Sequence, residues 1–310
     1  MKKLLFPNKQ NFTEEQFQSL RDLGIEVIFT AGPETDVYDE MDFSDIDAVV
    51  CFKFFSYNPV ERFPNLKYVH TTSTGYDQLP IKYFDEHGII WKNCPGVHSV
   101  PISEFVIGSV LQMYKHSHFL RANQRAHKWL CDWGVQELYQ KHVLVLSTGS
   151  IWQQVAKRFQ AFDTTVIGLD KFPNNKNGYY TEVGTMDRLD EELQKADVVV
   201  NCIPFFPGTF HLIDQHCFDL MQEKAIFINI TRGEIVDSEA LLKTLQSGKL
   251  LGAAIDVWEQ EPLPEDSPFW DIDRLLISCH NSFAGEGNLE RIFACIYNDT
   301  KAWLESCGET

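Results

Sequence analysis

The stretch HVLVLSTGSIWQQVAKRF, residues 142–159, joins a short apolar run, a tight turn and an amphipathic segment. A strand, turn and helix of this kind can bind a dinucleotide, and the usual turn then reads G-x-G-x-x-G. Here the six residues read STGSIW, so Gly149 keeps the second glycine position while Ser147 and Trp152 occupy the first and third. On its own, this turn fits an ordinary strand-to-helix connection slightly better than a cofactor site.

Apolar runs typical of buried strands alternate with helix-like segments in this part of the chain. The runs cover residues 143–146, 165–169, 197–203, 225–230, 253–258 and 275–278. Near-continuous apolar strands separated by helices predict a parallel sheet that is covered on both faces. Asp237 and Gly248 are typical of the residues that cap the two ends of one of these helices.

Residues 1–97 show a weaker form of the same alternation, and the segment 289–304 carries one apolar face that can return to them. We therefore predict an α/β protein with two Rossmann-like or flavodoxin-like domains, doubly wound parallel sheets with a cleft between them. The substrate-binding domain would be discontinuous, residues 1–97 plus 284–310. Residues 98–283 would form the nucleotide-binding domain, including one long connecting helix over 101–129.

The charge balance excludes two classes of partner. The chain of 310 residues carries 27 basic and 44 acidic residues, a formal net charge of -17. Nucleic acids and anionic membranes attract basic surfaces, so neither is expected as a partner. No apolar run approaches the length of a membrane span, and the run that ends at Phe6 is too short for a signal peptide. We expect a cytoplasmic protein.

Eight cysteines are spread along the chain without a C-x-x-C pair or the spacing of a zinc site. They are residues 51, 94, 131, 202, 217, 279, 295 and 307. A chain of this length can build a core that needs no disulfide to hold it. The spacing therefore predicts reduced thiols and no metal site.

Asp170 follows the turn by about 20 residues, at the end of the next predicted strand. An acidic side chain there accepts a hydrogen bond from a ribose 2′-hydroxyl and repels a 2′-phosphate, which favours NAD over NADP. Each replacement of a glycine in the turn has an energetic cost. A left-handed Ser147 costs about 1–2 kcal/mol, and a bulky Trp152 at a close-packed position costs about 1–3 kcal/mol. Because 1.4 kcal/mol is about tenfold in affinity, a weakened site would survive.

The run LMQEKAIFINITRGEIVDSEALLKTLQSGKLLGAAIDVWEQEPLPEDSPFWDIDRLLISCHNSFAG, residues 220–285, resembles the C-terminal signature of the NAD-dependent D-isomer-specific 2-hydroxyacid dehydrogenases. The resemblance extends upstream through NCIPFFPGTFHLID, the glycine-poor turn, and the stretches TTSTGYD and GVHSVPISEFVIG. It covers nearly the whole chain, and an ordered series of motifs is far more specific than any one of them. The resemblance implies an enzyme that uses NAD and acts on a small 2-hydroxy or 2-oxo acid.

The resemblance assigns catalytic roles to three residues. Arg232 in NITRG matches the arginine that grips the substrate carboxylate and polarises its carbonyl, a bidentate task suited to a guanidinium. His280 in SCHNSF matches the proton donor to the carbonyl oxygen, and Glu261 in WEQEP matches the acid that stabilises its imidazolium. Each residue alone would more often be a surface ion-pair member or a solvated group. Their positions after three successive predicted strands favour a catalytic set.

Further residues match cofactor and substrate contacts of the family. On the cofactor side they are Gly149, Ser150, Ile151, Asp170, Pro204, Thr209, Ile230, Thr231, Arg232 and Asp256. On the substrate side they are Arg232 and the loop of Thr74, Gly75 and Tyr76. The N–H groups of that loop would hold the substrate carboxylate, although an ordinary glycine turn explains the loop equally well. Asp256 matches the residue that binds the nicotinamide carboxamide.

The predicted reaction is the reversible NADH-dependent reduction of a small 2-oxo acid to a D-2-hydroxy acid. Two alternatives stay open: a catalytically weak or silent dinucleotide-binding homologue, and a glyoxylate/hydroxypyruvate-type reductase that prefers NADPH, which Asp170 disfavours. Formate dehydrogenases resemble the same fold but carry Gln at the position of Glu261, which counts against them. The resemblance also implies a homodimer built around the connecting helix, with Trp129 or Trp133 reaching the partner subunit.

Overall fold

The computed structural model describes residues 1–7, 9 and 11–308. The chain divides into two compact units: Met1–His98 with Gly285–Thr310, and Ser99–Ala284. Each boundary lies one residue beyond the one predicted from the sequence. Within the described residues, no helix combines the length and the apolar character that a membrane span requires.

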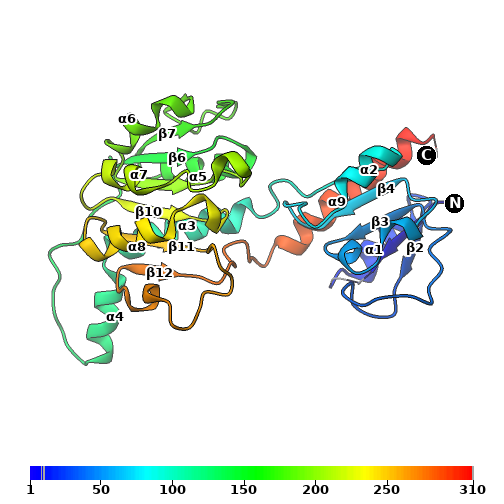
Figure 1. Cartoon of the computed structure of the whole chain (residues 1–310), viewed down its shortest axis with the longest axis horizontal. Helices are drawn as coiled ribbons and strands as arrows, with labels where there is room; N and C mark the ends of the chain where they lie inside the picture. Colours follow the sequence, from blue (N-terminus) through cyan, green and yellow to red (C-terminus); the bar gives the residue numbers. More distant parts are fainter. Residues whose placement is uncertain (8, 10, 309–310) are drawn as a thin grey trace. The chain divides into compact units, whose positions relative to one another are not determined.

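The first unit is built on a five-stranded sheet in which every pairing is parallel. In spatial order the strands are β2 (Glu26–Phe29), β1 (Lys3–Phe6), β3 (Ala48–Cys51), β4 (Tyr68–Thr71) and β5 (Ile90–Lys92). Its helices are α1 (Glu14–Arg21), α2 (Ile81–His87) and α9 (Asn288–Ser306), as Figure 1 shows. The order 2-1-3-4-5 is that of a flavodoxin-like sheet, as the sequence pattern predicts.

Side chains of β1 alternate between two apolar layers, as a strand period of two requires. Leu4 and Phe6 pack with α1 and α9, whereas Leu5 packs in a cluster on the other face. The last helix belongs to this unit because its apolar face lies in the same core. Trp303 of α9 stacks on Tyr68 of β4, with ring centroids 4.8 Å apart.

The second unit contains a seven-stranded sheet that is also parallel throughout. In spatial order the strands are β12 (Leu275–Ile277), β11 (Gly252–Ile255), β10 (Ile226–Asn229), β9 (Val198–Asn201), β6 (His142–Leu146), β7 (Thr165–Leu169) and β8 (Glu182–Gly184). Its helices are α3 (Ser99–Tyr114), α4 (Ser117–Arg125), α5 (Ser150–Gln160), α6 (Leu189–Leu193), α7 (Gln215–Leu220) and α8 (Ser238–Ser247). Short 3₁₀ turns occur in connections of both units, at Phe54–Ser56, Val60–Arg62, Met186–Arg188, Pro207–Thr209, Gly233–Ile235 and Pro268–Asp271.

Strand β6 lies inside this sheet, between β9 and β7, and contributes to both of its covering layers. Val143 and Val145 pack in the cluster that contains α3 and α5, and Leu144 and Leu146 pack in the cluster that contains α6, α7 and α8. The chain order reverses between β6 and β9, which are neighbours in the sheet. A doubly wound sheet binds ligands at such a reversal, beyond the carboxyl ends of the strands.

The predicted connecting helix is wrong in one respect, because two helices occupy the segment. Helix α3 ends at Tyr114 and α4 begins at Ser117. Between them His116 adopts a left-handed conformation, with φ of 47°, and its Nδ1 lies 2.7 Å from Oδ2 of Asp132. The predicted caps of α8 are confirmed, since the Asp237 side chain accepts from two N–H groups and Gly248 ends the helix with φ of 76°.

Candidate active site

Three predicted catalytic residues follow three neighbouring strands of the second unit. Arg232 lies three residues after β10, Glu261 lies in the loop after β11, and His280 lies three residues after β12. Parallel strands end at the same edge of a sheet, so these loops share the edge at which open α/β sheets bind ligands. We call this group, Arg232, Glu261 and His280, the catalytic edge.

His280 and Glu261 form a direct pair. Nδ1 of His280 lies 2.8 Å from Oε2 of Glu261, and both side chains are partly exposed. The other carboxylate oxygen of Glu261 accepts a hydrogen bond from the N–H of Trp258 at 3.0 Å, which fixes the orientation of the carboxylate. With Nδ1 engaged in this way, Nε2 of His280 is the ring nitrogen that can exchange a proton with a substrate.

Asp256 holds the loop that carries His280. This carboxylate is almost fully buried and accepts hydrogen bonds from Ser278 Oγ at 2.6 Å, from Asn281 N at 2.9 Å, and from both N and Oγ of Ser282. Its backbone carbonyl accepts from the His280 N–H at 2.8 Å. His280 is held with a positive φ of 53°, an unusual conformation that these bonds maintain. Asp256 therefore positions His280. Its contact with the nicotinamide carboxamide stays a prediction.

Arg232 is positioned by its neighbours on both sides. Its backbone carbonyl accepts a hydrogen bond from Asn229 Nδ2 at 3.1 Å, and its Nη1 donates to Thr231 O at 2.7 Å. The next residue, Gly233, lies against the backbone that leads to Glu261. A Cβ at this glycine would be 1.9 Å from the carbonyl carbon of Trp258, so no larger residue fits without moving the chain. Gly233 thus sets the distance between the loop of Arg232 and the loop after β11.

Two buried asparagines, which were not predicted from the sequence, support this arrangement. Asn201 ends β9 and Asn229 ends β10, and Nδ2 of Asn201 donates to Oδ1 of Asn229 at 3.1 Å. Oδ1 of Asn201 also accepts from the N–H of Ile203 at 3.3 Å. The signal in the sequence is an amide side chain that closes each of two otherwise apolar strands, VVVN and IFIN. A buried amide needs partners, and at these positions the partners are the loops of the site.

The turn after β6 keeps the path of a dinucleotide turn although it lacks two glycines. Ser147 has φ of 107°, a conformation that glycine favours. Its hydroxyl donates to Oδ2 of Asp170 at 2.9 Å, and the N–H of Thr148 donates to the same oxygen at 2.6 Å. Partial burial alone would raise the pKa of Asp170, but these bonds and one from the N–H of Phe172 outweigh it and lower the pKa. The acid at the end of β7 is therefore ionised and is tied to the turn.

Trp152 lies against the glycine that remains. Gly149 is the N-cap of α5, and a Cβ built on it would have the indole of Trp152 as its nearest neighbour, with Cδ1 at 3.5 Å. The open face of Gly149, which a pyrophosphate approaches in a dinucleotide turn, is thus lined by an aromatic ring. Ser150 and Ile151 form the first turn of α5, and their side chains lie outside the described part of the structure.

Other predicted cofactor residues lie in the loops beyond β9 and β10. Ile230 and Thr231 are buried directly after β10. Thr209 is buried too, and its hydroxyl donates to the carbonyl of Pro204 at 3.2 Å and accepts from the N–H of Phe206 at 2.9 Å. The Thr209 side chain therefore shapes its own loop, and contact with a nucleotide stays a prediction for this residue and for Pro204.

The predicted substrate loop belongs to the first unit and follows β4. Oγ1 of Thr74 donates to the carbonyl of Cys94 at 3.0 Å, and Asn93 Nδ2 donates to the carbonyl of Thr74 at 2.7 Å. Within the described residues, the N–H groups of Thr74, Gly75 and Tyr76 donate to no protein group. Consecutive N–H groups without protein acceptors are available to bind an anion such as a carboxylate.

Comparison with known proteins identifies the family. The model of the D-isomer specific 2-hydroxyacid dehydrogenase NAD binding domain matches residues 107–282. A glyoxylate reductase of Thermofilum pendens is 31% identical over 76% of this chain and 72% of its own length. A D-3-phosphoglycerate dehydrogenase of Methanocaldococcus jannaschii is 28% identical over 88% of this chain, which spans about half, 52%, of that relative.

A solved structure agrees over the full length. The D-isomer specific 2-hydroxyacid dehydrogenase from Xanthobacter autotrophicus Py2, in complex with NADPH and MES, has a TM-score of 0.77 and 25% identity, covering 100% of this chain and 96% of that one. The chain belongs to the D-isomer specific 2-hydroxyacid dehydrogenase family. The family, the oxidoreductase class, the NAD cofactor and the two-domain Rossmann-like fold predicted from the sequence are confirmed.

The residues present fit a dinucleotide. The turn follows β6 at the reversal of strand order, and Gly149 carries no Cβ that would block approach to the start of α5. The ionised Asp170 stands at the end of the adjacent strand β7. These are the backbone and acidic elements that receive a pyrophosphate and a ribose in this fold. Among the described side chains, the Trp152 ring lies next to Gly149 and so changes the surface offered to the cofactor.

Proposed function

We propose that the enzyme catalyses the reversible NADH-dependent reduction of a small 2-oxo acid to a D-2-hydroxy acid. Nε2 of His280 donates a proton to the carbonyl oxygen of the substrate, and in the reverse direction it accepts that proton from the hydroxyl. Glu261 stabilises the imidazolium that exists before this donation. Arg232 binds the substrate carboxylate and withdraws electron density from the carbonyl. When bound, the nicotinamide supplies or accepts the hydride.

The observation that carries this proposal is the hydrogen bond between His280 Nδ1 and Glu261 Oε2, 2.8 Å long, at the carboxyl edge of β11 and β12. A histidine whose Nδ1 is held by a carboxylate presents Nε2 as an acid and base. The close approach of Gly233 to the Trp258 backbone holds the loop of Arg232 against the loop that carries Glu261. The proton donor and the ligand of the substrate carboxylate therefore come from the same edge of the sheet.

The N–H groups of the loop Thr74–Tyr76 are proposed to hold the substrate carboxylate. Their lack of protein acceptors within the described chain supports this role. Two activities named among the relatives, glyoxylate reductase and D-3-phosphoglycerate dehydrogenase, both concern small acids that bear a carboxylate. An anion site made of backbone N–H groups accepts any such acid, so the side chain of the substrate is selected elsewhere.

A panel of 2-oxo acids tests the reaction. Glyoxylate, pyruvate, hydroxypyruvate, and branched and aromatic 2-oxo acids are supplied with NADH, and absorbance of the reduced nicotinamide is followed. We expect consumption of NADH with at least one small member, and chiral analysis should find the D product. If NADH binds but no member of the panel is reduced, the protein is the silent dinucleotide-binding homologue instead.

A second candidate is a glyoxylate/hydroxypyruvate-type reductase that prefers NADPH. It is favoured by the similar Xanthobacter autotrophicus structure, which was determined in complex with NADPH. Against it stands the ionised Asp170, whose carboxylate would repel a 2′-phosphate. We propose NADH as the preferred cofactor. The ratio of kcat/KM for NADH and NADPH decides between the two, and Asp170→Asn should move that ratio toward NADPH.

We also propose a cytoplasmic homodimer built around α3, α4 and the segment that follows. Trp129 and Trp133 are 97% and 91% exposed, and Leu120 and Leu130 are exposed as well. An apolar group of this kind marks a protein contact surface. All eight cysteines are free thiols, which suits a reducing compartment. Light scattering should give the mass of a dimer, and Trp129→Ala with Trp133→Ala should shift the mass toward a monomer.

A further inference from the structure

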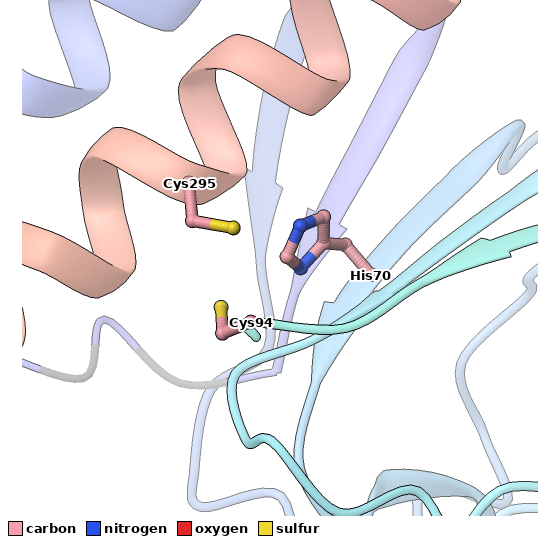
Figure 2. A group of neighbouring side chains, drawn as sticks. All are labelled: His70, Cys94 and Cys295. Atoms are coloured by element: carbon pink, nitrogen blue, oxygen red, sulfur yellow. The ribbon is translucent and has the colours of Figure 1, made fainter. Parts of the chain in front are cut away.

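Side chains from three distant parts of the first unit meet beside the predicted substrate loop. His70 lies on β4, Cys94 lies two residues after β5, and Cys295 lies on α9. Their ligand atoms are all within 4.8 Å of one another, and Figure 2 shows the three side chains pointing toward a common centre. His70 and Cys94 are fully buried and Cys295 is partly buried, so water has little access to this group.

A fourth donor, Asp299, stands one helical turn after Cys295 on the same face of α9. Its Oδ2 lies 3.1 Å from Nε2 of His70 and 3.8 Å from Sγ of Cys295. Ligands that are about 2.0–2.3 Å from a tetrahedral zinc ion are separated from each other by about 3.4–3.8 Å. His70, Cys94 and Cys295, whose ligand atoms lie within 4.8 Å of one another, need to close in by about 1 Å to adopt that geometry, and Asp299 adjoins two of them.

The histidine is oriented as a metal ligand is. Nδ1 of His70 is 3.0 Å from the backbone carbonyl of Thr71, so it carries the proton that this bond requires. Nε2 is then the nitrogen that faces the group, where it pairs with Oδ2 of Asp299 at 3.1 Å, and a metal ion would take the place of the proton between these two atoms. A metal-bound histidine is held in this way by an outer carbonyl, which fixes both the tautomer and the ring plane.

We propose that His70, Cys94, Cys295 and Asp299 form a structural zinc site. Two thiolates, one imidazole and one carboxylate are a donor set that zinc prefers, and a closed set of four protein ligands leaves no position for a substrate. This site was not predicted from the sequence, because His70 and Cys94 are 24 residues apart, Cys94 and Cys295 are 201 residues apart, and the paired spacing of zinc motifs is missing.

Several hydrogen bonds connect this zinc site to the substrate loop. The N–H of Cys94 donates to the carbonyl of Ser73 at 3.0 Å, and the carbonyl of Cys94 accepts from Thr74 Oγ1 at 3.0 Å. Sγ of Cys295 is 3.7 Å from the carbonyl of Asn93, whose side chain holds Thr74. A metal ion at this place would fix the loop and the middle of α9 together, and would stabilise the first unit by binding only its folded form.

Cobalt(II) provides a test that does not depend on enzyme activity. The full-length protein is stripped with a chelator under reducing, anaerobic conditions and titrated with CoCl₂. We expect thiolate-to-cobalt charge-transfer bands and intense visible bands that saturate at one equivalent, and ZnCl₂ should then displace the cobalt. Zinc should also raise the Tm of the stripped protein until one equivalent has been added.

Cys295→Ser and Cys94→Ser should abolish the charge-transfer bands and the zinc-dependent Tm rise. Cys307→Ser is the matched control, because this exposed cysteine ends the same helix without joining the group, and it should behave as the wild type. Asp299→Asn replaces a partly exposed ligand and should lower zinc affinity at least tenfold, while the far-ultraviolet circular dichroism stays unchanged. This variant keeps the test valid if a cysteine variant fails to fold.

Two results would overturn the zinc site. One is that the charge-transfer bands persist in both Cys94→Ser and Cys295→Ser. The other is that the stripped wild type shows no thiolate-to-cobalt band. A redox pair is the competing explanation, since the Sγ atoms of Cys94 and Cys295 lie within 4.8 Å of each other. It would replace our proposal if diamide treatment linked Cys94 to Cys295 in peptide mass spectra while the reduced protein gave no cobalt spectrum.

Discussion

The catalytic edge and the turn after β6 lie at the carboxyl ends of strands in one sheet, yet they differ in how closely they follow the family pattern. At the catalytic edge, Arg232, Glu261 and His280 are all present, and the last two are hydrogen-bonded. In the turn, Ser147 and Trp152 replace two of three glycines. The difference shows that the two regions depend on different properties. The turn needs a backbone conformation, which Ser147 can adopt in place of a glycine, whereas the catalytic edge needs particular side chains.

The turn replaces the freedom of glycine with a specific hydrogen bond. Ser147 is held at φ of 107° by the bond from its hydroxyl to Asp170, and the neighbouring N–H of Thr148 bonds the same oxygen. Strain of about 1–2 kcal/mol in a non-glycine residue is thereby offset by about 1 kcal/mol from the added bond. At the catalytic edge, by contrast, the proposed roles of His280 and Arg232 rest on the chemistry of those side chains, a titrating imidazole and a planar guanidinium, which a change in backbone hydrogen bonding does not replace.

His280→Gln should have the largest effect on the reaction. Loss of the proton donor is expected to lower kcat about 10²–10⁴-fold, with NADH affinity unchanged because the turn is untouched. Steady-state kinetics and NADH titration measure the two quantities separately. His216→Gln is the control, because His216 forms a similar histidine–carboxylate pair with Asp190 on the surface. A variant at 280 with wild-type turnover would remove the assigned role.

Gly233→Ala should damage stability most. Its Cβ would lie 1.9 Å from the carbonyl carbon of Trp258, which is main chain and cannot rotate away. The unfolding free energy should fall by about 3 kcal/mol or more. Gly108→Ala is the control, since that helical glycine has open space around it and the substitution should stabilise α3 slightly. Equal stability of both variants in urea denaturation would show that the close approach is misplaced.

Glu261→Gln should have an intermediate effect. The amide keeps the shape but cannot stabilise the imidazolium of His280, and a hydrogen bond to a charged group contributes about 1.5–3 kcal/mol. The expected fall in kcat is about tenfold to a hundredfold. Rapid-mixing kinetics should place this loss in the chemical step. A change confined to KM would mean that Glu261 acts on substrate binding instead.

Restoring the glycines of the turn should have the smallest effect. Ser147→Gly combined with Trp152→Gly removes the strain and clears the ring from Gly149, so NADH should bind up to about tenfold tighter. Ser147→Ala is the matched contrast, because it keeps the strain and loses the bond to Asp170, and it should bind NADH more weakly. If the double variant binds no better than the wild type, the turn has a geometry adapted to its own residues.

Much of this architecture could be predicted from local sequence. Continuous apolar runs gave the inner strands, and caps such as Asp237 and Gly248 gave the ends of α8, because these signals depend on neighbours in the chain. The short edge strand β8, Glu182–Gly184, was not predicted, since EVG has no distinctive pattern. The break between α3 and α4 was not predicted either, because it depends on a contact of His116 with Asp132, 16 residues away.

Within the site, the residues themselves could be predicted from the sequence, but the contacts that position them could not. The resemblance named His280 and Glu261, and the structure shows them paired. The close approach of Gly233 to Trp258 and the bonds of Asp256 to the loop after β12 join residues more than 20 positions apart. No periodicity in a single sequence records such contacts, and the same holds for the group of His70, Cys94 and Cys295.

We propose that the altered turn still binds a dinucleotide beside the predicted catalytic residues Arg232, Glu261 and His280. Titration of the purified protein with NADH, followed by nicotinamide fluorescence and by thermal shift, tests it most directly. We predict saturable binding with one site per chain and a rise in Tm, for wild type and for His280→Gln alike. No fluorescence change and no thermal shift at millimolar NADH would contradict the claim.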